Sequence, residues 1–535
     1  MLGYAYRDLS EPEKDARRHA LDSVGHYIVL SQLVILILAA SYRFAFCPWR
    51  PRVQSAFLRK LEWRLMTPFS WASPESKSLA DWGARWGWFG WILWLVLREA
   101  GDDYLHVTKA FGMAAAANFP MHMLLSMKRS PLRYVFSVSY EGEINHLHQG
   151  LGKIIHLLLC AHAMLYLIFF WDTSRMKTRL LEYDVLCGVA GFIFLNIIVT
   201  ASYPWVRRSY HRIFYILHTT ISPLLFPLLF LHVSHLRAYL LVSLALFIFD
   251  RLRRTLTRVQ TTATVHQLSD DILHLTISLH QSVFTPPRPV SHLLLTIPGI
   301  SPWTSNPFTV ADFSRAAGNV QIVARIRNGT TKRLASIAAS SQEETKIPVV
   351  LEMNYGACPN YRHLHSQFDR ILIIAGGVGG AFAVPWIKYL ASTPNALART
   401  RLIWAMRDVA TLCWAVSTST AADVIKEKAE VFLTSTSRNQ EETDEGVEMQ
   451  ETHLLSGGHD REETVAQLEK LGVGKERVTL GRPDLEAVLK EIAGGGSVAV
   501  LVCGPWGLGA GVKKIAAARV KMGERVWVHV EEFGS

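Results

Sequence analysis

Almost all long apolar runs of this 535-residue chain lie between residues 26 and 250. A helix needs about 20 apolar residues to cross a bilayer, and only helices or closed barrels satisfy their own backbone hydrogen bonds there. The runs therefore predict a helical membrane domain at 26–250, after an N-terminal tail at 1–25 that has no apolar core of a signal peptide. The seven predicted spans are 26–46, 82–98, 104–126, 146–170, 184–202, 210–233 and 237–250.

Basic residues predict the orientation of these spans. The loops after the first, third, fifth and seventh spans carry most of the Lys and Arg residues, which marks them as cytoplasmic. Residues from 256 onward then lie in the cytoplasm, and only the basic N-terminal tail breaks the rule. The net charge of +11 is concentrated at span ends, so it does not indicate nucleic-acid binding. The pattern predicts a multi-pass membrane protein. The plasma membrane is the expected location, and a vacuolar or other internal membrane, which has the same topology, is the alternative.

Two histidine pairs with one spacing lie in this apolar half. His148 and His162 have 13 residues between them, and so do His218 and His232. Fourteen helical steps make nearly four turns and rise about 21 Å, so each pair lies on one face at two depths. A single histidine in a membrane more often packs or lines a cavity, but a spacing repeated in two spans favours metal ligation.

Two such helices can hold two haems between them. We predict an inner pair, His148 and His218, and an outer pair, His162 and His232. The other histidines of this half are interpreted as structural or interfacial, namely His26, His106, His122, His146, His156, His211 and His235.

Residues 256–365 alternate in the manner of short strands and predict an antiparallel β-barrel. The segment "SNPFTV" places Pro307, Phe308 and Thr309 on an extended strand. The segment "RNGTTKRL" offers Gly329 and Thr331 beside basic side chains, a combination that can hold a pyrophosphate. Taken alone, each segment fits an ordinary strand or turn as well as it fits a nucleotide site.

Residues 366–535 read as buried strands alternating with helices, which predicts a Rossmann-like α/β domain. The turn "AGGVGG" follows one strand, and its glycines allow a phosphate to approach a helix N-terminus. A "CGP" segment ends another strand, where ligands of such sheets bind. Residues 434–463, rich in Ser, Thr, Glu and Asp, are expected to be a disordered insertion. The six cysteines form no CxxC pair, so no zinc site or disulfide framework is expected.

Together these motifs resemble the fungal ferric reductase family, which is related to the NADPH oxidases. The resemblance covers roughly residues 80–535. It implies two b-type haems on His148, His162, His218 and His232, FAD on Pro307, Phe308 and Thr309, and NADPH on Gly376, Gly377, Gly379, Cys503, Gly504 and Pro505. Gly329 and Thr331 are added to the predicted flavin site from their own sequence pattern. Phe533 matches the family's C-terminal segment that covers the flavin. Arg407 is either a partner of the NADPH 2′-phosphate or a solvated charge at a strand end.

The chain departs from the family at two places. Asn306 replaces the histidine of the flavin motif and keeps its hydrogen bonding without a charge. The chain ends Phe533-Gly534-Ser535 where many relatives end in an aromatic residue, so access of the nicotinamide is expected to differ.

The resemblance implies a multidomain membrane protein: a transmembrane helical bundle, an antiparallel β-barrel FAD domain and a ferredoxin reductase-like NADPH domain. It implies an NADPH-dependent ferric-chelate reductase that moves electrons from cytosolic NADPH through FAD and the haems to ferric or cupric chelates, for iron or copper uptake. Two alternatives stay open, an NADPH oxidase that produces superoxide and a degenerate cytochrome b without reductase activity. NADH also stays open as the donor.

Overall fold

The computed structural model describes residues 4–46, 60–61, 63–65, 78–136, 144–280, 289, 291–340, 345–356, 364–393, 395–434, 458–494 and 496–532. The chain divides into two compact units. One unit is helical and ends at Leu256, and the other begins at Thr257 and also includes the 49–79 segment.

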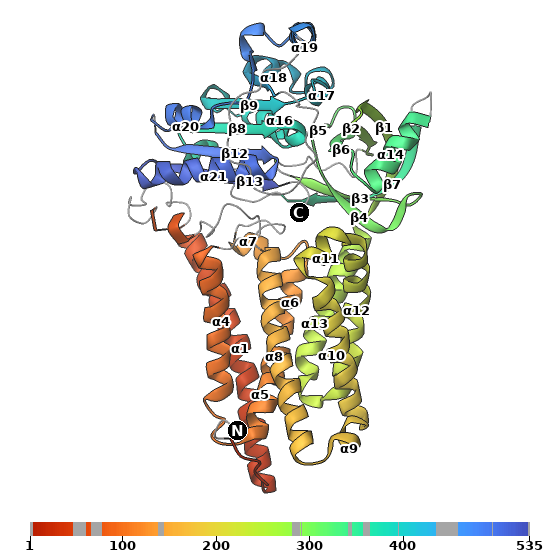
Figure 1. Cartoon of the computed structure of the whole chain (residues 1–535), viewed down its shortest axis with the longest axis vertical. Helices are drawn as coiled ribbons and strands as arrows, with labels where there is room; N and C mark the ends of the chain where they lie inside the picture. The colour runs from red at the N-terminus through yellow and green to blue at the C-terminus, as the bar shows by residue number, and fades with distance from the viewer. Residues whose placement is uncertain are drawn as a thin grey trace. The chain divides into compact units, whose positions relative to one another are not determined.

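The first unit is a bundle of long helices (Figure 1). They are α1 (Glu11–Phe46), α4 (Leu79–Leu97), α5 (Tyr104–Ala117), α8 (Asn145–Asp172), α10 (Tyr183–Ala201), α12 (His211–His232) and α13 (Arg237–Leu256). Shorter helices are α6 (Phe119–Ser126), α7 (Leu132–Phe136), α9 (Met176–Leu180), α11 (Pro204–Ser209) and η3 (Ser234–Leu236). Within the described residues, four helices are long and apolar enough to cross a membrane, namely α1, α8, α10 and α12. The other three predicted spans are helical but fall outside that criterion of length and composition.

The first helix begins at Glu11, well before the predicted span at residue 26. Ser10 precedes it, and both the backbone N–H and the hydroxyl of Ser10 donate to Glu13. A serine followed three residues later by glutamate is a capping box, which starts a helix by satisfying free backbone groups. Part of the predicted tail is therefore helix, and the Ser-x-x-Glu signal for it was present in the sequence.

The third predicted span consists of two helices, α5 and α6, that meet at Asn118. The Asn118 amide donates to the Ala114 carbonyl at 2.7 Å, and its oxygen accepts from Gln32 at 2.8 Å and Trp88 at 3.2 Å. Pro120 in the first turn of α6 supplies no backbone N–H. The helix is therefore interrupted at a buried polar side chain and a proline, where hydropathy alone indicated one continuous helix.

The strands of residues 259–355 form one antiparallel sheet that makes a half-barrel, which confirms the predicted class. They are β1 (Val259–Ser269), β2 (Ile272–Ser278), β3 (His292–Ile297), β4 (Ser301–Thr309), β5 (Asp312–Ser314), β6 (Asn319–Arg325) and β7 (Thr345–Tyr355). Their order is β4-β3-β7-β1-β2-β6-β5. Alternate side chains of β1 and β2, such as Ala263, Val265, Leu273 and Leu275, fill its core together with Leu334 of α14 (Thr330–Ser340).

The remainder of this unit is a parallel sheet with helices on it, as predicted. Its strands are β8 (Arg370–Gly376), β9 (Thr400–Met406), β10 (Ala429–Leu433), β11 (Val478–Leu480), β12 (Val498–Gly504) and β13 (Val526–Glu532). The helices are α15 (Leu364–Gln367), η5 (Gly377–Gly379), α16 (Gly380–Ala391), η6 (Leu397–Arg399), α17 (Ala410–Ser417), α18 (Ala422–Lys428), α19 (Gly458–Lys470), η7 (Lys475–Arg477), α20 (Leu485–Ala493) and α21 (Trp506–Lys521). Most of the predicted insertion at 434–463 lies outside the described residues, and its last part belongs to α19.

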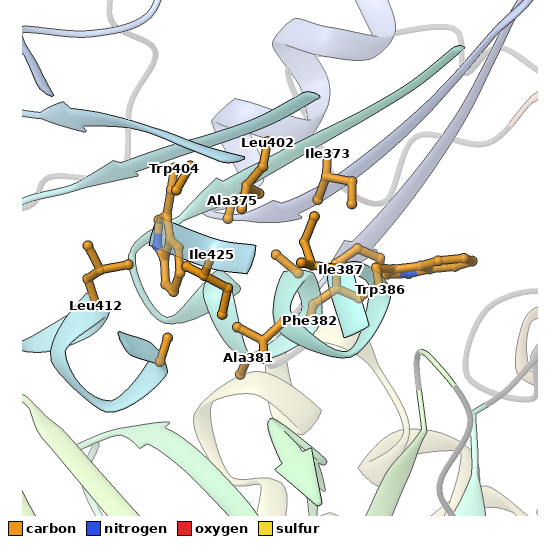
Figure 2. Close-up of a cluster of buried hydrophobic side chains, with 14 of the residues drawn as sticks. Ile373, Ala375, Ala381, Phe382, Trp386, Ile387, Leu402, Trp404, Leu412 and Ile425 are labelled. Carbon is orange, nitrogen blue, oxygen red and sulfur yellow. The ribbon is translucent and has the colours of Figure 1, made fainter. Parts of the chain in front are cut away.

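The strand order β11-β10-β9-β8-β12-β13 reverses direction between β8 and β12. Such a reversal is a topological switch point, and ligands of open α/β sheets bind at the carboxyl ends of the strands there. Figure 2 shows Phe382, Trp386 and Ile387 of α16 beside Ile373 of β8. This apolar packing fixes the helix that follows the glycine turn against the sheet.

Candidate functional site

The structure brings the four predicted haem ligands into two facing pairs. The ring centroids of His148 on α8 and His218 on α12 are 6.3 Å apart. Those of His162 and His232, on the same two helices, are 6.5 Å apart. Two metal–nitrogen bonds of about 2 Å in line, plus the distance from each nitrogen to its ring centre, come to about 6 Å. Each pair therefore fits one iron held between two imidazoles.

Each of these imidazoles is held by a hydrogen bond from its Nδ1 atom. The acceptors are the His122 carbonyl for His148 (3.3 Å), the Thr108 carbonyl for His162 (2.8 Å), the Ser202 hydroxyl for His218 (3.3 Å) and the Asp184 carbonyl for His232 (2.7 Å). A ligating histidine usually donates its second ring N–H in this way, which fixes the tautomer and the ring orientation. With Nδ1 protonated, Nε2 is the nitrogen that can bind iron.

Two glycines that the sequence analysis did not single out make room for the outer pair. A Cβ atom on Gly112 of α5 would lie 2.8 Å from the His162 ring, and one on Gly188 of α10 would lie 2.6 Å from the His232 ring. Both separations are too short for a side chain, so the imidazoles occupy space that only glycine leaves. A lone glycine inside an apolar helix was the available signal.

Three of the histidines interpreted as structural behave differently from one another. His156 bonds Asn196 at 3.1 Å and faces neither pair, and His211 is exposed. His122 instead stacks on His148, with centroids 4.1 Å apart and planes at 19°. It is therefore part of the inner site, a role that its sequence position did not reveal.

The two halves of the predicted flavin site lie next to each other in the half-barrel. Pro307, Phe308 and Thr309 end β4, and Gly329 and Thr331 stand at the start of α14. The Asn306 amide donates to the Thr330 hydroxyl at 3.2 Å and joins the two segments. The residue that departs from the family motif thus makes the link.

The start of α14 has the geometry of an anion site. Gly329 adopts a φ of +101°, a conformation that glycine adopts readily. The Thr331 hydroxyl accepts the Arg327 N–H at 2.8 Å, so it closes the turn. Lys332 and Arg333 already donate their N–H groups to the Arg327 and Gly329 carbonyls. The N–H groups of Thr330 and Thr331 at the start of the helix are therefore the ones that suit a pyrophosphate.

The two predicted nucleotide motifs meet at the switch point. Cys503 at the end of β12 pairs with Ala375 of β8, so the glycine turn and the Cys-Gly-Pro segment are adjacent. A Cβ atom on Gly379 would clash with the Cys503 carbonyl, and one on Gly504 would lie 3.1 Å from the Gly376 nitrogen. These glycines permit close backbone contact between the two turns.

Gly377 is needed for a different reason. Apart from its chain neighbours, no described residue has an atom within 4 Å of where its side chain would be, but its φ is +53°. Its carbonyl accepts a hydrogen bond from the Trp404 indole at 3.0 Å, which fixes the turn. Positive φ, not crowding within the protein, therefore constrains this position.

Cys503 is fully buried at the strand end. Burial raises the pKa of its thiol well above the ordinary value, and the Glu531 carboxylate on β13 raises it further. The thiol is therefore neutral at physiological pH. Pro505, next along the chain, precedes α21. Arg407 is exposed just after β9, and Phe533 lies outside the described residues.

Three family models match successive parts of the chain. They are the ferric reductase like transmembrane component at residues 111–229, an FAD-binding domain at 257–360 and the ferric reductase NAD binding domain at 368–517. The chain belongs to the ferric reductase family. As a member of that family it is a multi-pass membrane protein with FAD- and NAD-binding domains, and its transmembrane domain implies haem.

Curated ferric reductases of yeasts resemble the chain at low identity. Ferric/cupric reductase transmembrane component 2 of Schizosaccharomyces pombe is 24% identical over 57% of this chain and 62% of its own length. Ferric reductase transmembrane component 5 of Saccharomyces cerevisiae is 24% identical over 79% of this chain and 60% of its own length. The aligned part thus spans about 60% of these relatives.

A relative of more similar extent is a probable metalloreductase, AIM14, of Meyerozyma guilliermondii, 25% identical over 77% of this chain and 83% of its own length. Among solved structures, a flavohemoglobin from Malassezia yamatoensis with bound FAD and heme is 12% identical over 78% of this chain and 96% of its own. Its TM-score of 0.35 is too low to support an argument.

Proposed function

We propose that this ferric reductase family member carries electrons from NADPH across a membrane to a ferric or cupric chelate. The proposal rests on the two facing histidine pairs. The ring centroids are 6.3 Å apart in the inner pair and 6.5 Å apart in the outer pair, and the Nδ1 atom of every ring already has a hydrogen-bond partner. A histidine that only packed helices together would not need a second imidazole opposite it at this distance while its own Nδ1 atom is already bonded.

The membrane half provides two metal positions along one pair of helices. His148 and His218 would hold the inner haem, and His162 and His232 would hold the outer haem. When bound, FAD would supply the conversion of hydride into single electrons and the haems would supply one-electron transfer, so the redox chemistry would belong to the cofactors. The contribution of the chain is to fix the imidazoles at two depths, about 21 Å apart along each helix.

The second unit provides the nucleotide sites. Thr309 at the end of β4 and the first turn of α14 hold the flavin and its pyrophosphate. The Gly376–Gly379 turn receives the phosphates of NADPH, because both its backbone N–H groups and the start of α16 favour an anion. Cys503 presents a neutral thiol at the carboxyl end of β12, and Arg407 binds the 2′-phosphate.

The names of the relatives support a metal chelate as the acceptor. The S. pombe relative is called a ferric/cupric reductase, and the M. guilliermondii relative a probable metalloreductase. Reduction on the outer side of the plasma membrane would serve iron or copper uptake.

Acceptor-dependent turnover of the purified protein tests the function. NADPH oxidation is measured in detergent or nanodiscs with ferric citrate, cupric ion or O₂ as the acceptor. We expect two haems per chain and faster oxidation with ferric citrate than with O₂ alone. Superoxide as the main product would favour an NADPH oxidase. Well-folded protein without haem, or haems that NADPH does not reduce, would contradict the proposal.

A further inference from the structure

His122 stands out among the histidines because it touches a haem-ligand candidate. It lies in α6, one turn after Asn118, whose carbonyl accepts the His122 N–H at 3.0 Å. Its ring stacks on that of His148 at 4.1 Å and 19°. His122 of α6 therefore lies against His148 of α8.

His122 contacts His148 in two separate ways. Its backbone carbonyl accepts the Nδ1–H of His148 at 3.3 Å, and its side chain covers one face of the same imidazole. The first contact fixes which nitrogen of His148 is free. The second opposes rotation of the His148 ring about its own axis.

The chain leaves space for this ring on α8. A Cβ atom on Gly152, one turn after His148, would lie 3.0 Å from Nε2 of His122. The Nδ1 atom of His122 is buried and has no hydrogen-bond partner among the described residues. Burying an unpaired polar atom is costly, so simple space filling would favour an apolar side chain at this position.

In the described structure the other three candidate ligands have no parallel imidazole neighbour. The nearest ring to His162, apart from its partner, is Tyr166 at 5.0 Å and 75°. His218 has Phe214 at 5.4 Å and 53°. Parallel support is thus a feature of His148.

We propose that His122 is a positioning residue for the inner haem, which acts by holding the ring plane of His148. Groups that orient a metal ligand also tune the metal, and for haem iron the reduction potential is among the properties tuned. The inference rests on the proposed haem sites and adds a residue to them.

Two substitutions separate the flat ring from the rest of the residue. His122→Leu removes the stacked ring but keeps the backbone carbonyl, and His122→Phe keeps a flat ring without its nitrogens. His156→Leu is the matched control, since His156 lies in the same bundle and bonds Asn196 instead of a ligand. The readouts are haem content, the low-spin ferric EPR signals and potentiometric titration of both haems.

We expect His122→Leu to change the EPR signal of the inner haem and to shift its reduction equilibrium relative to the outer haem threefold to tenfold. A tenfold shift is about 59 mV for one electron. The outer haem should stay unchanged, His122→Phe should restore most of the inner signal, and His156→Leu should match wild type. Loss of the inner haem in His122→Leu with retention in His122→Phe would also support the stacked ring as the cause.

Two results would overturn the inference. One is a His122→Leu protein with both haems and unchanged signals and potentials. The other is a His122→Phe protein as altered as His122→Leu. Wild-type protein without haem would instead remove the proposed function itself, so the two failures are distinguishable.

Discussion

The helical unit and the nucleotide unit build their candidate sites from opposite parts of the residue. In the helical unit the binding groups are four side chains, each held by a backbone carbonyl or hydroxyl. In the nucleotide unit the proposed phosphate site uses backbone N–H groups, and at its turns glycine excludes side chains. Glycine is essential in both, but in the bundle Gly112 and Gly188 admit an imidazole, whereas Gly379 and Gly504 admit another stretch of backbone.

This contrast predicts different kinds of failure. Removing an imidazole deletes one metal position and leaves the fold, because the surrounding helices are held by their own apolar contacts. Adding a side chain at a glycine of the switch point displaces a strand end, so binding and stability are lost together. The experiments below separate these outcomes.

Removal of a ligand should have the largest effect. His162→Ala or His232→Ala should lower the haem content from two per chain to one and abolish chelate reduction, because no iron can then be held at the outer depth. His148→Ala or His218→Ala should remove the inner haem instead. A pyridine haemochrome assay measures the content, and two haems in any of these variants would exclude that residue as a ligand.

A side chain on Gly379 should come next. The added Cβ atom would clash with the Cys503 carbonyl, and no side-chain rotation can separate a Cβ atom from a backbone oxygen. We expect Gly379→Ala to weaken NADPH binding at least tenfold and to destabilise this unit by about 1–3 kcal/mol. Haem reduction by dithionite should persist. Unchanged NADPH kinetics would show that the two turns are not held together in the manner described.

Gly377 gives a matched comparison in the same turn. Its φ of +53° strains a β-branched residue, at a cost of about 1–3 kcal/mol. Gly377→Val should therefore raise the KM for NADPH with haem content nearly unchanged, while Gly377→Asn, which tolerates positive φ, should do so much less. Equal effects of Val and Asn would point to obstruction of the nucleotide and not to backbone strain.

Features that depend on local geometry could be predicted from the sequence. Helix periodicity relates His148 to His162 because both lie on one helix, and strand and glycine patterns indicated the half-barrel and the parallel sheet. The capping box at Ser10 is a local signal of the same kind, and it marks a helix that begins within the predicted tail. The fold class is confirmed, whereas the assignment of individual ligands stays a prediction.

Contacts between elements were beyond a single sequence. Nothing local indicates that the Thr108 and Asp184 carbonyls hold His162 and His232, or that Gly188 faces an imidazole. The stacking of His122 on His148 is a contact between α6 and α8, which no local pattern in the sequence indicates. Likewise, Asn306 reads as a lost flavin contact until its bond to Thr330, from a distant segment, is seen.

A methyl group on Gly188 tests the glycine role inside the bundle. The Cβ atom would lie 2.6 Å from the His232 ring, so the ring must shift. We expect Gly188→Ala to weaken retention of the outer haem about tenfold, in the lower part of the range for groups that support a ligand. Gly90→Ala on α4 is the control, since no atom lies within 4 Å of its Cβ position. Equal haem retention in both variants would mean that His232 can move without cost.

The smallest effect is expected at Ser202, and it compares the inner and outer anchors. Its hydroxyl donates to the Ile198 carbonyl at 2.7 Å and accepts the His218 Nδ1–H at the long distance of 3.3 Å. The outer anchors are backbone carbonyls at 2.7 and 2.8 Å, which no side-chain substitution removes.

Ser202→Ala should therefore accelerate loss of the inner haem only a few-fold, because one neutral hydrogen bond contributes about 1 kcal/mol. Haem transfer to apomyoglobin measures the rate. The control is Ser243→Ala on α13, because the Ser243 hydroxyl donates to the Tyr239 carbonyl of its own helix. If Ser202→Ala released the outer haem as fast as the inner one, the anchors would not act on individual ligands, and the four imidazoles would have to be treated as one coupled site.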